Sequence, residues 1–115
     1  NPAATDLSVG LLSFDPAQAV GSTKLPVLVL GGGKDLQVDP ELDAKPLHEA
    51  GRRGGADVSL VIAPNADHVL KLEDMELDEL RSNPVVLAGR YNAEGRTLDP
   101  QVGEAIVQWL DGQTR

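Results

Sequence analysis

Two side chains suited to proton transfer follow the two most apolar runs of the chain. Asp35 comes after "PVLVL", residues 26–30, and His68 comes after "VSLVI", residues 58–62. Unbroken aliphatic runs of this length are typical of strands in a parallel sheet that is covered on both faces. Catalytic groups collect at the carboxyl ends of such strands. The pattern therefore predicts that Asp35 and His68 emerge at one edge of the sheet, within hydrogen-bonding reach, as an acid–histidine pair.

The glycines before Asp35 do not predict a nucleotide site. A phosphate-binding loop needs Ser or Thr after its lysine, and here Lys34 is followed by Asp35. A dinucleotide fingerprint needs a further Gly at the position of Leu36. We therefore interpret the segment as a strand, a turn made by residues 31–33, and a carboxylate.

The elements that position the pair are marked by three Asp-Pro steps, at residues 15–16, 39–40 and 99–100. In each, Asp can cap a helix and Pro can occupy its first position. The predicted elements are a short helix over 16–22, a strand over 26–30, a turn over 40–42, a helix over 43–53, a strand over 58–62 and an amphipathic helix over 100–110. The predicted fold class is α/β, with two parallel strands, flanking helices and a C-terminal helix in one domain, residues 1–115.

Other polar segments have less specific interpretations. The acid-rich run over residues 71–81 is predicted to be a solvated helix, since it lacks the D-x-D-x-D-G pattern of a calcium loop. No element is predicted between Asn83 and Arg96. His48 falls within a predicted helix and is expected to be solvated or half-buried, because no carboxylate spacing supports a metal site with His68. We predict no metal and no cofactor.

Composition restricts the classes of function. The chain has a net charge of −8 and 41% hydrophobic residues, which is typical of a globular protein and argues against binding to nucleic acid. No apolar run approaches the roughly 18 residues of a membrane span, so no membrane partner is predicted. Cysteine is absent, which excludes thiolate catalysis and disulfides and leaves the cellular compartment open.

Several short motifs occur in an order that resembles a known family. They are "DPA" at 15–17, "LPVLVL" at 25–30, Gly32, Lys34-Asp35, Gln37-Val38, Asn65, His68 and Trp109-Leu110. From Phe14 onward the chain resembles the C-terminal part of α/β-hydrolases, especially the esterase and acyl-hydrolase branches related to prolyl oligopeptidase and dienelactone hydrolase. The resemblance implies a partial α/β-hydrolase fold that contains the last two parallel strands of the sheet.

The resemblance also implies roles for individual residues. His68 would be the general base and Asp35 the acid that orients it, in a serine hydrolase acting on ester or acyl substrates. The chain contains no G-x-S-x-G motif, which carries the nucleophile in this family. We therefore expect a fragment of a longer hydrolase that is inactive alone. Val38, Val69 and Leu70 flank the pair and are expected to line an acyl pocket or to pack in the core.

A second function class remains open at this point. The chain can be a non-catalytic interaction or self-association domain that retains part of the hydrolase sheet. Two strands leave an unpaired apolar edge, which favours association. The predicted partners are therefore the missing N-terminal portion of the hydrolase or a second copy of the chain, together with a small ester or acyl substrate when the enzyme is complete.

Overall fold

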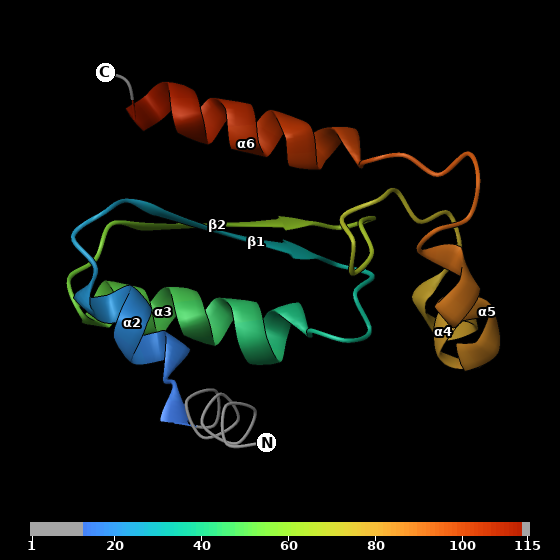
Figure 1. The fold of residues 1–115 in the computed structure, drawn as a ribbon, viewed down its shortest axis with the longest axis horizontal. Helices are drawn as coiled ribbons and strands as arrows, with labels where there is room; N and C mark the ends of the chain where they lie inside the picture. Colours follow the sequence, from blue (N-terminus) through green and yellow to red (C-terminus); the bar gives the residue numbers. More distant parts are fainter. Residues whose placement is uncertain (1–12, 114–115) are drawn as a thin grey trace, which may run out of the picture.

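The computed structural model describes residues 13–113 of the chain. Its elements, in order, are α2 (Pro16–Ser22), β1 (Val27–Gly32), the π-helical turn η1 (Pro40–Ala44), α3 (Lys45–Arg53), β2 (Val58–Ala63), α4 (Leu77–Arg81), α5 (Pro84–Arg90) and α6 (Pro100–Gln113). Figure 1 shows α2 and α3 on one face of the sheet, α6 on the other, and α4 and α5 beyond the carboxyl ends of the strands. This arrangement confirms a mixed α/β fold.

The sheet consists of β1 and β2, which are parallel, as the sequence predicted. Val27 pairs with Val58 at one end of the register, and Gly32 pairs with Ala63 at the other. β1 is two residues longer at its carboxyl end than predicted: Gly31 and Gly32, expected in the turn, belong to the strand. The turn that carries Asp35 therefore begins only at Gly33.

The predicted helix caps are present. One carboxylate oxygen of each capping Asp accepts hydrogen bonds from backbone N–H groups in the first turn of its helix: Asp15 from Ala17 and Gln18, Asp39 from Glu41 and Leu42, and Asp99 from Gln101. The turn expected over residues 40–42 and the helix expected over 43–53 form a continuous helical stretch, η1 followed by α3. Pro46 is the second residue of α3 and lies at the junction with the π-helical turn, where the hydrogen-bond pattern changes.

The core is small and lies on both faces of the sheet. Val29, Ala44 and Val58 are buried between the sheet and the α3 side. Ala63, Ala66 and Val102 form a second cluster beneath α6. Val102 is fully buried, whereas Ile106 and Leu110 of the same helix remain 37% and 50% exposed. The sheet therefore holds α6 mainly through the first turn of that helix.

The helix predicted over residues 71–81 is wrong over its first half. Only the stretch from Leu77 is helical, whereas Lys71 forms an isolated β-bridge with Leu98 and Leu72 forms one with Ala66. Glu73, expected on a solvated face, is buried. The reason is tertiary: Arg90 and Arg96 neutralise this carboxylate, and local charge patterning carries no signal of that pairing. The stretch after Asn83, which had no predicted element, contains α5.

β1 has an open side. Among residues 13–113, β1 is hydrogen-bonded to β2 alone, so both strands are edge strands of the described sheet. Val27, Leu28 and Leu30 are only half-buried although helices cover both faces. An apolar strand that is half exposed at its edge is suited to pairing with a further strand. Among the helices of residues 13–113, none combines the length and the hydropathy of a membrane-spanning segment.

Candidate active site

The structure brings Asp35 and His68 into direct contact. The Nδ1 atom of His68 lies 3.1 Å from Oδ1 and 3.0 Å from Oδ2 of Asp35. An ionised carboxylate can only accept hydrogen bonds, so Nδ1 carries the hydrogen and Nε2 of the neutral ring has the free lone pair. The Asp35 side chain is 9% exposed and that of His68 is 34% exposed. The pair therefore presents a base to the surroundings while its acid is shielded.

The turn after β1 holds the Asp35 carboxylate in place. Its Oδ1 atom accepts hydrogen bonds from the backbone N–H groups of Gln37, at 2.8 Å, and Val38, at 2.9 Å. The backbone N–H of Asp35 donates to the carbonyl of Gly32. A short acidic side chain bonded to the backbone two and three residues ahead is a common turn motif. These local hydrogen bonds thus orient the acid independently of its contact with His68.

His68 reaches the same edge because the loop after β2 folds tightly over the end of β1. A Cβ atom on Gly32 would lie within 2.6 Å of the Asp67 carbonyl oxygen, and one on Gly33 would lie 2.5 Å from the Pro64 carbonyl oxygen. Glycine is therefore required at both positions for the close approach of the two backbones. In the same loop, Leu70 adopts a φ of 63°, in the left-handed region. The glycine-rich sequence serves this approach rather than a phosphate.

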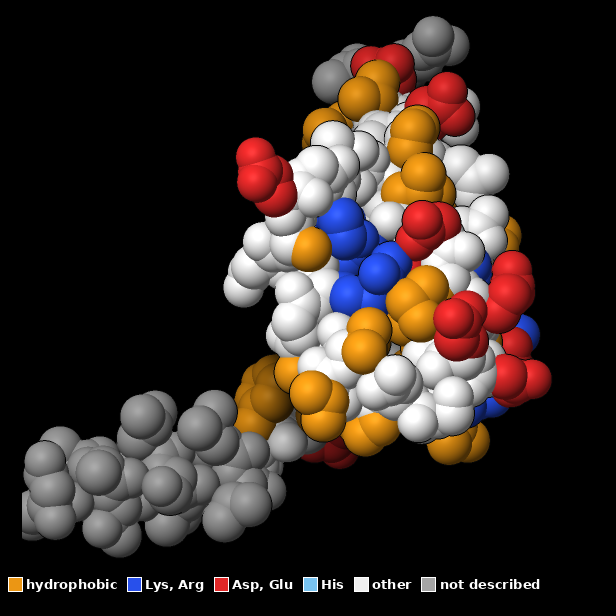
Figure 2. Space-filling model, turned by 90° about the vertical axis from the view of Figure 1, so that its right-hand side faces the viewer, with side chains coloured by type: hydrophobic (Ala, Val, Ile, Leu, Met, Phe, Trp, Pro, Cys, Tyr) orange, Lys and Arg blue, Asp and Glu red, His pale blue; other side chains and the backbone are white. Residues whose placement is uncertain are grey.

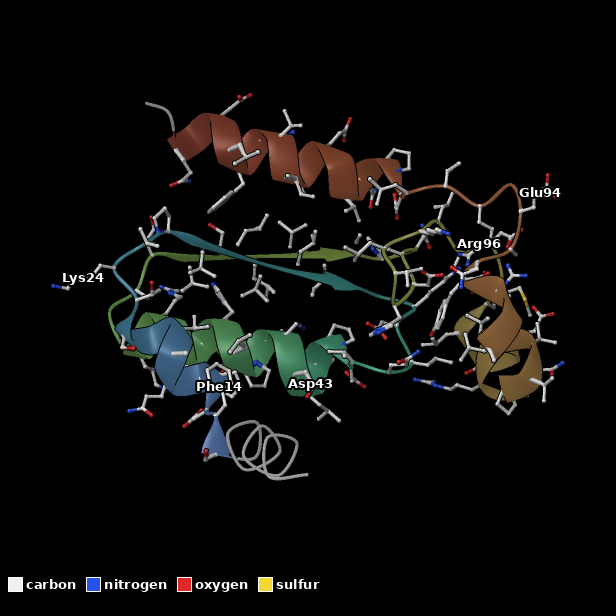
Figure 3. All side chains as sticks on the ribbon, in the orientation of Figure 1. Phe14, Lys24, Asp43, Glu94 and Arg96 are labelled. Atoms are coloured by element: carbon white, nitrogen blue, oxygen red, sulfur yellow. The ribbon has the colours of Figure 1, made fainter. Side chains whose placement is uncertain are left out.

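The residue before His68 anchors its loop. Asp67 is buried, and its Oδ1 accepts hydrogen bonds from the backbone N–H groups of Val69 and Lys71. Its Oδ2 accepts a 2.7 Å hydrogen bond from Nη1 of Arg96. Figure 3 shows Arg96 at the junction between α5 and this loop. Asp67 therefore stabilises the loop that carries His68 by hydrogen bonds within the loop and by one hydrogen bond to Arg96, in the segment after α5.

A second buried carboxylate lies next to this anchor. Glu73 accepts a 2.8 Å hydrogen bond from Nε of Arg90, and Arg96 lies 3.4 Å away. Burial by itself raises the pKa of Glu73, but the hydrogen bonds from Arg90 and from the Met75 N–H, with the charges of Arg90 and Arg96, outweigh it and lower the pKa from 4.5 to about 2. The carboxylate of Glu73 raises the pKa of Arg90. Glu73 and Arg90 therefore remain ionised throughout the neutral range.

Figure 2 shows the end of the molecule formed by α4 and α5, where Lys and Arg side chains lie beside Asp and Glu side chains. No histidine of the described residues is visible on this face. His68 is therefore not exposed on this face.

A cavity of about 310 Å³ opens onto the pair. Its lining combines both site residues with mainly apolar side chains and backbone: Val29, Leu30, Gly31, Gly32, Asp35, Val38, Pro40, Asp43, Ala44, Leu47, His68 and Leu70. Val38 and Leu70, predicted to line an acyl pocket, are thus at the cavity, whereas Val69 is 41% exposed and outside it. The lining includes four residues of β1 and none of β2, which places the cavity toward the open side of β1.

The cavity lacks a hydroxyl nucleophile from the described part of the chain, since no Ser or Thr of residues 13–113 lines it. The serines at 22 and 82 donate hydrogen bonds to helix carbonyls and are exposed. His48 lies apart from the site: its Nε2 is 3.2 Å from the Val58 carbonyl oxygen, and the residue is half-buried, as expected. Among residues 13–113, no three His, Asp or Glu side chains form a group able to hold a metal ion.

Tyr91, which had no predicted part in the site, contacts both His68 and Gln37. The ring centroids of Tyr91 and His68 are 5.9 Å apart with a tilt of 46°. The Tyr91 hydroxyl accepts a 3.0 Å hydrogen bond from Nε2 of Gln37, in the turn that holds Asp35. The residue follows α5, in a stretch without hydrophobic periodicity. A single aromatic residue in such a stretch has no pattern that could have assigned it.

Comparisons of the chain with family models, with curated proteins and with solved structures gave no match.

Proposed function

We propose that this chain is the C-terminal, acid- and histidine-bearing segment of a serine hydrolase with an α/β-hydrolase fold. The observation that supports the proposal is the contact of the Asp35 carboxylate with Nδ1 of His68 at the carboxyl ends of adjacent parallel strands. In Ser-His-Asp hydrolases the acid binds this same ring nitrogen, leaving Nε2 for the serine. The chain order, acid before histidine, is that of α/β-hydrolases.

The chemistry follows from the two ring nitrogens. Nε2 of His68 accepts the proton of a serine hydroxyl as the serine oxygen attacks the carbonyl carbon of an ester. The resulting imidazolium is stabilised by Asp35 and returns the proton to the leaving alcohol. Water then attacks the acyl-enzyme by the same route, with His68 again acting as the base. The serine would come from sequence outside the residues described.

The cavity supports an acyl substrate of moderate size. A volume of about 310 Å³ is at the lower end of the range for small-molecule sites. Val38, Leu47 and Leu70 would contact the hydrocarbon part of the substrate, and Asp35, His68 and Asp43 supply the polar part of the lining. Such a site favours a neutral ester or acyl group.

The position of the cavity also supports pairing of the missing N-terminal portion of the hydrolase with β1. The cavity lies toward the unpaired side of β1, and the missing nucleophile must approach His68 through it. We infer that the strand leading to the serine completes the sheet along this side of β1. Half-exposed Leu28 and Leu30 would become buried on pairing. The predicted N-terminal portion of the hydrolase is the occupant that this geometry fits.

The decisive experiment uses the polypeptide that contains residues 1–115 together with the preceding sequence of the same reading frame. We expect a G-x-S-x-G motif in that sequence and hydrolysis of p-nitrophenyl butyrate. His68→Ala and Asp35→Asn should each lower kcat by about 10⁴-fold, because the base or its orientation is lost. His48→Ala and Asp78→Asn are the matched controls and should leave kcat within about threefold of the parent.

Two outcomes would overturn the proposal. One is turnover retained by His68→Ala in a folded protein. The other is a preceding sequence without the serine motif, which would favour the interaction domain instead, with the open side of β1 as its binding surface.

A further inference from the structure

Tyr91 contacts the candidate histidine from outside the cavity. Its ring is tilted against that of His68, and it is not among the residues that line the cavity. A side chain that touches the base but lies outside the cavity is placed to act on the base rather than on a substrate. The ring of Tyr91 restricts the rotation of the imidazole, because two rings in contact exclude the alternative side-chain orientations of either.

The hydroxyl of Tyr91 reaches the acid through one intermediate. Nε2 of Gln37 donates to this hydroxyl at 3.0 Å, and the backbone N–H of Gln37 donates to Oδ1 of Asp35 at 2.8 Å. These contacts form a ring of four residues: Asp35, His68, Tyr91 and Gln37. The contact between His68 and Tyr91 is between their aromatic rings, and the other three are hydrogen bonds. A single aromatic side chain thus contacts His68 directly and is linked to Asp35 through Gln37.

The backbone around Tyr91 is held independently of its ring. Nζ of Lys71 donates to the Tyr91 carbonyl oxygen at 2.6 Å. The preceding residue, Arg90, binds the buried Glu73, and Arg96 binds the buried Asp67 next to His68. These contacts fix the segment to the loop that carries the histidine. The ring of Tyr91 is thus presented from a rigid support, as a positioning group requires.

We propose that Tyr91 is a positioning residue for the Asp35–His68 pair. Its ring sets the orientation of the imidazole, and its hydroxyl, through Gln37, holds the turn that presents the carboxylate. The inference rests on the proposed function for its catalytic consequence, whereas the positioning itself can be measured without catalysis.

The positioning is tested on the 115-residue chain by NMR of the His68 ring nitrogens, with His48 in the same spectrum as an internal reference. In the parent chain the neutral ring should carry its hydrogen on Nδ1. Tyr91→Leu keeps apolar bulk but removes the ring, and it should raise the population of the Nε2–H tautomer of His68 several-fold.

Tyr91→Phe keeps the ring and should leave the tautomer of His68 unchanged, but it should speed hydrogen exchange at the N–H groups of Gln37 and Val38. Val85→Ala, at an exposed position of α5, is the control and should change neither signal.

The catalytic consequence is tested in the longer protein with p-nitrophenyl butyrate. Tyr91→Leu should lower kcat by about 10–100-fold with little change in KM, because the base is misoriented rather than the substrate unbound. Gln37→Ala should lower kcat less, and adding Tyr91→Phe to it should have no further effect, because both changes break the same hydrogen bond.

The outcomes separate this inference from the proposed function. An unchanged His68 spectrum and an unchanged kcat in folded Tyr91→Leu would overturn the positioning role, even if His68→Ala abolishes turnover. Turnover retained by His68→Ala would instead overturn the hydrolase proposal, and the NMR result would still decide whether Tyr91 orients the imidazole.

Discussion

The Nζ atom of Lys34 lies 2.8 Å from the carbonyl oxygen of Glu73, and this hydrogen bond joins the turn after β1 to the segment after β2. Lys34 is buried and directly precedes Asp35, while Glu73 follows the loop that carries His68. This hydrogen bond therefore connects the segments that carry Asp35 and His68 in addition to the acid–histidine contact itself. A lysine that resembles part of a phosphate loop in sequence serves here as a structural donor.

Removing this donor should destabilise the protein. Lys34→Met keeps the apolar stem but leaves the Glu73 carbonyl without its buried partner. We expect this change to lower the free energy of unfolding by about 1–3 kcal/mol. Urea unfolding followed by circular dichroism measures the change. Lys24→Met is the matched control, because Lys24 is exposed and extends away from the fold (Figure 3), and it should be neutral. Equal stability of the two variants would contradict a structural role for Lys34.

A side chain at Gly32 should separate the pair. The Cβ atom of Gly32→Ala would press on the Asp67 carbonyl, so the loop must move away from β1 at a cost of about 1–3 kcal/mol. Unfolding curves give the cost, and loss of the Asp35–His68 contact would appear in the His68 ring nitrogen signals. Gly89→Ala, in α5 with open space around it, should instead stabilise by about 0.5–1 kcal/mol. A stable Gly32→Ala chain with an unchanged His68 spectrum would argue against the tight approach.

Acid should destabilise the protein through Glu73. Its pKa is about 2 in the folded state and 4.5 is its ordinary value, so the unfolded state binds more protons between these limits. The contribution of Glu73, about 3 kcal/mol, is complete above pH 4.5 and is lost as the pH falls toward 2. Urea unfolding at several pH values measures the slope. Glu73→Gln should reduce that slope, Glu104→Gln on the exposed face of α6 should retain it, and equal slopes in both would contradict the assignment.

The open side of β1 should make the isolated chain associate with itself. Light scattering should show a mass above the 12.1 kDa of one chain at high concentration. Val38 is 44% exposed at the cavity beside Asp35, and Val38→Asp would add a third carboxylate to a lining that already contains Asp35 and Asp43. That change should weaken association by at least about tenfold, since burial of an unpaired charge costs more than 1.4 kcal/mol. Val85→Asp on α5 is the control. A chain that stays monomeric at all concentrations would contradict the proposed use of this edge.

The strands, the helix caps and the acid–histidine contact could all be predicted from the sequence, because each depends on local rules. Aliphatic runs indicate buried strands, Asp-Pro steps indicate helix starts, and parallel strands bring their carboxyl ends to one edge. The contact between Asp35 and His68, 33 positions apart, follows from these rules alone. Its catalytic role stays a prediction.

The support around the pair could not be predicted. The burial of Glu73 depends on Arg90 and Arg96, which are 17 and 23 positions away with no periodic pattern between them. A run rich in Asp and Glu ordinarily forms a solvated surface, and tertiary ion pairs reverse that expectation at a single residue. Tyr91 was missed for the same reason, since its partners Gln37 and His68 come from other parts of the chain.

The uneven burial of α6 implies a gradient of local stability along that helix. Val102 anchors the first turn, while Ile106 and Leu110 remain partly exposed to solvent. Opening of the last turns therefore breaks few apolar contacts and requires little free energy, whereas opening of the first turn disrupts the core beneath it. Backbone amides near Gln113 should thus exchange with solvent by fraying, and those near Val102 only when the sheet itself unfolds.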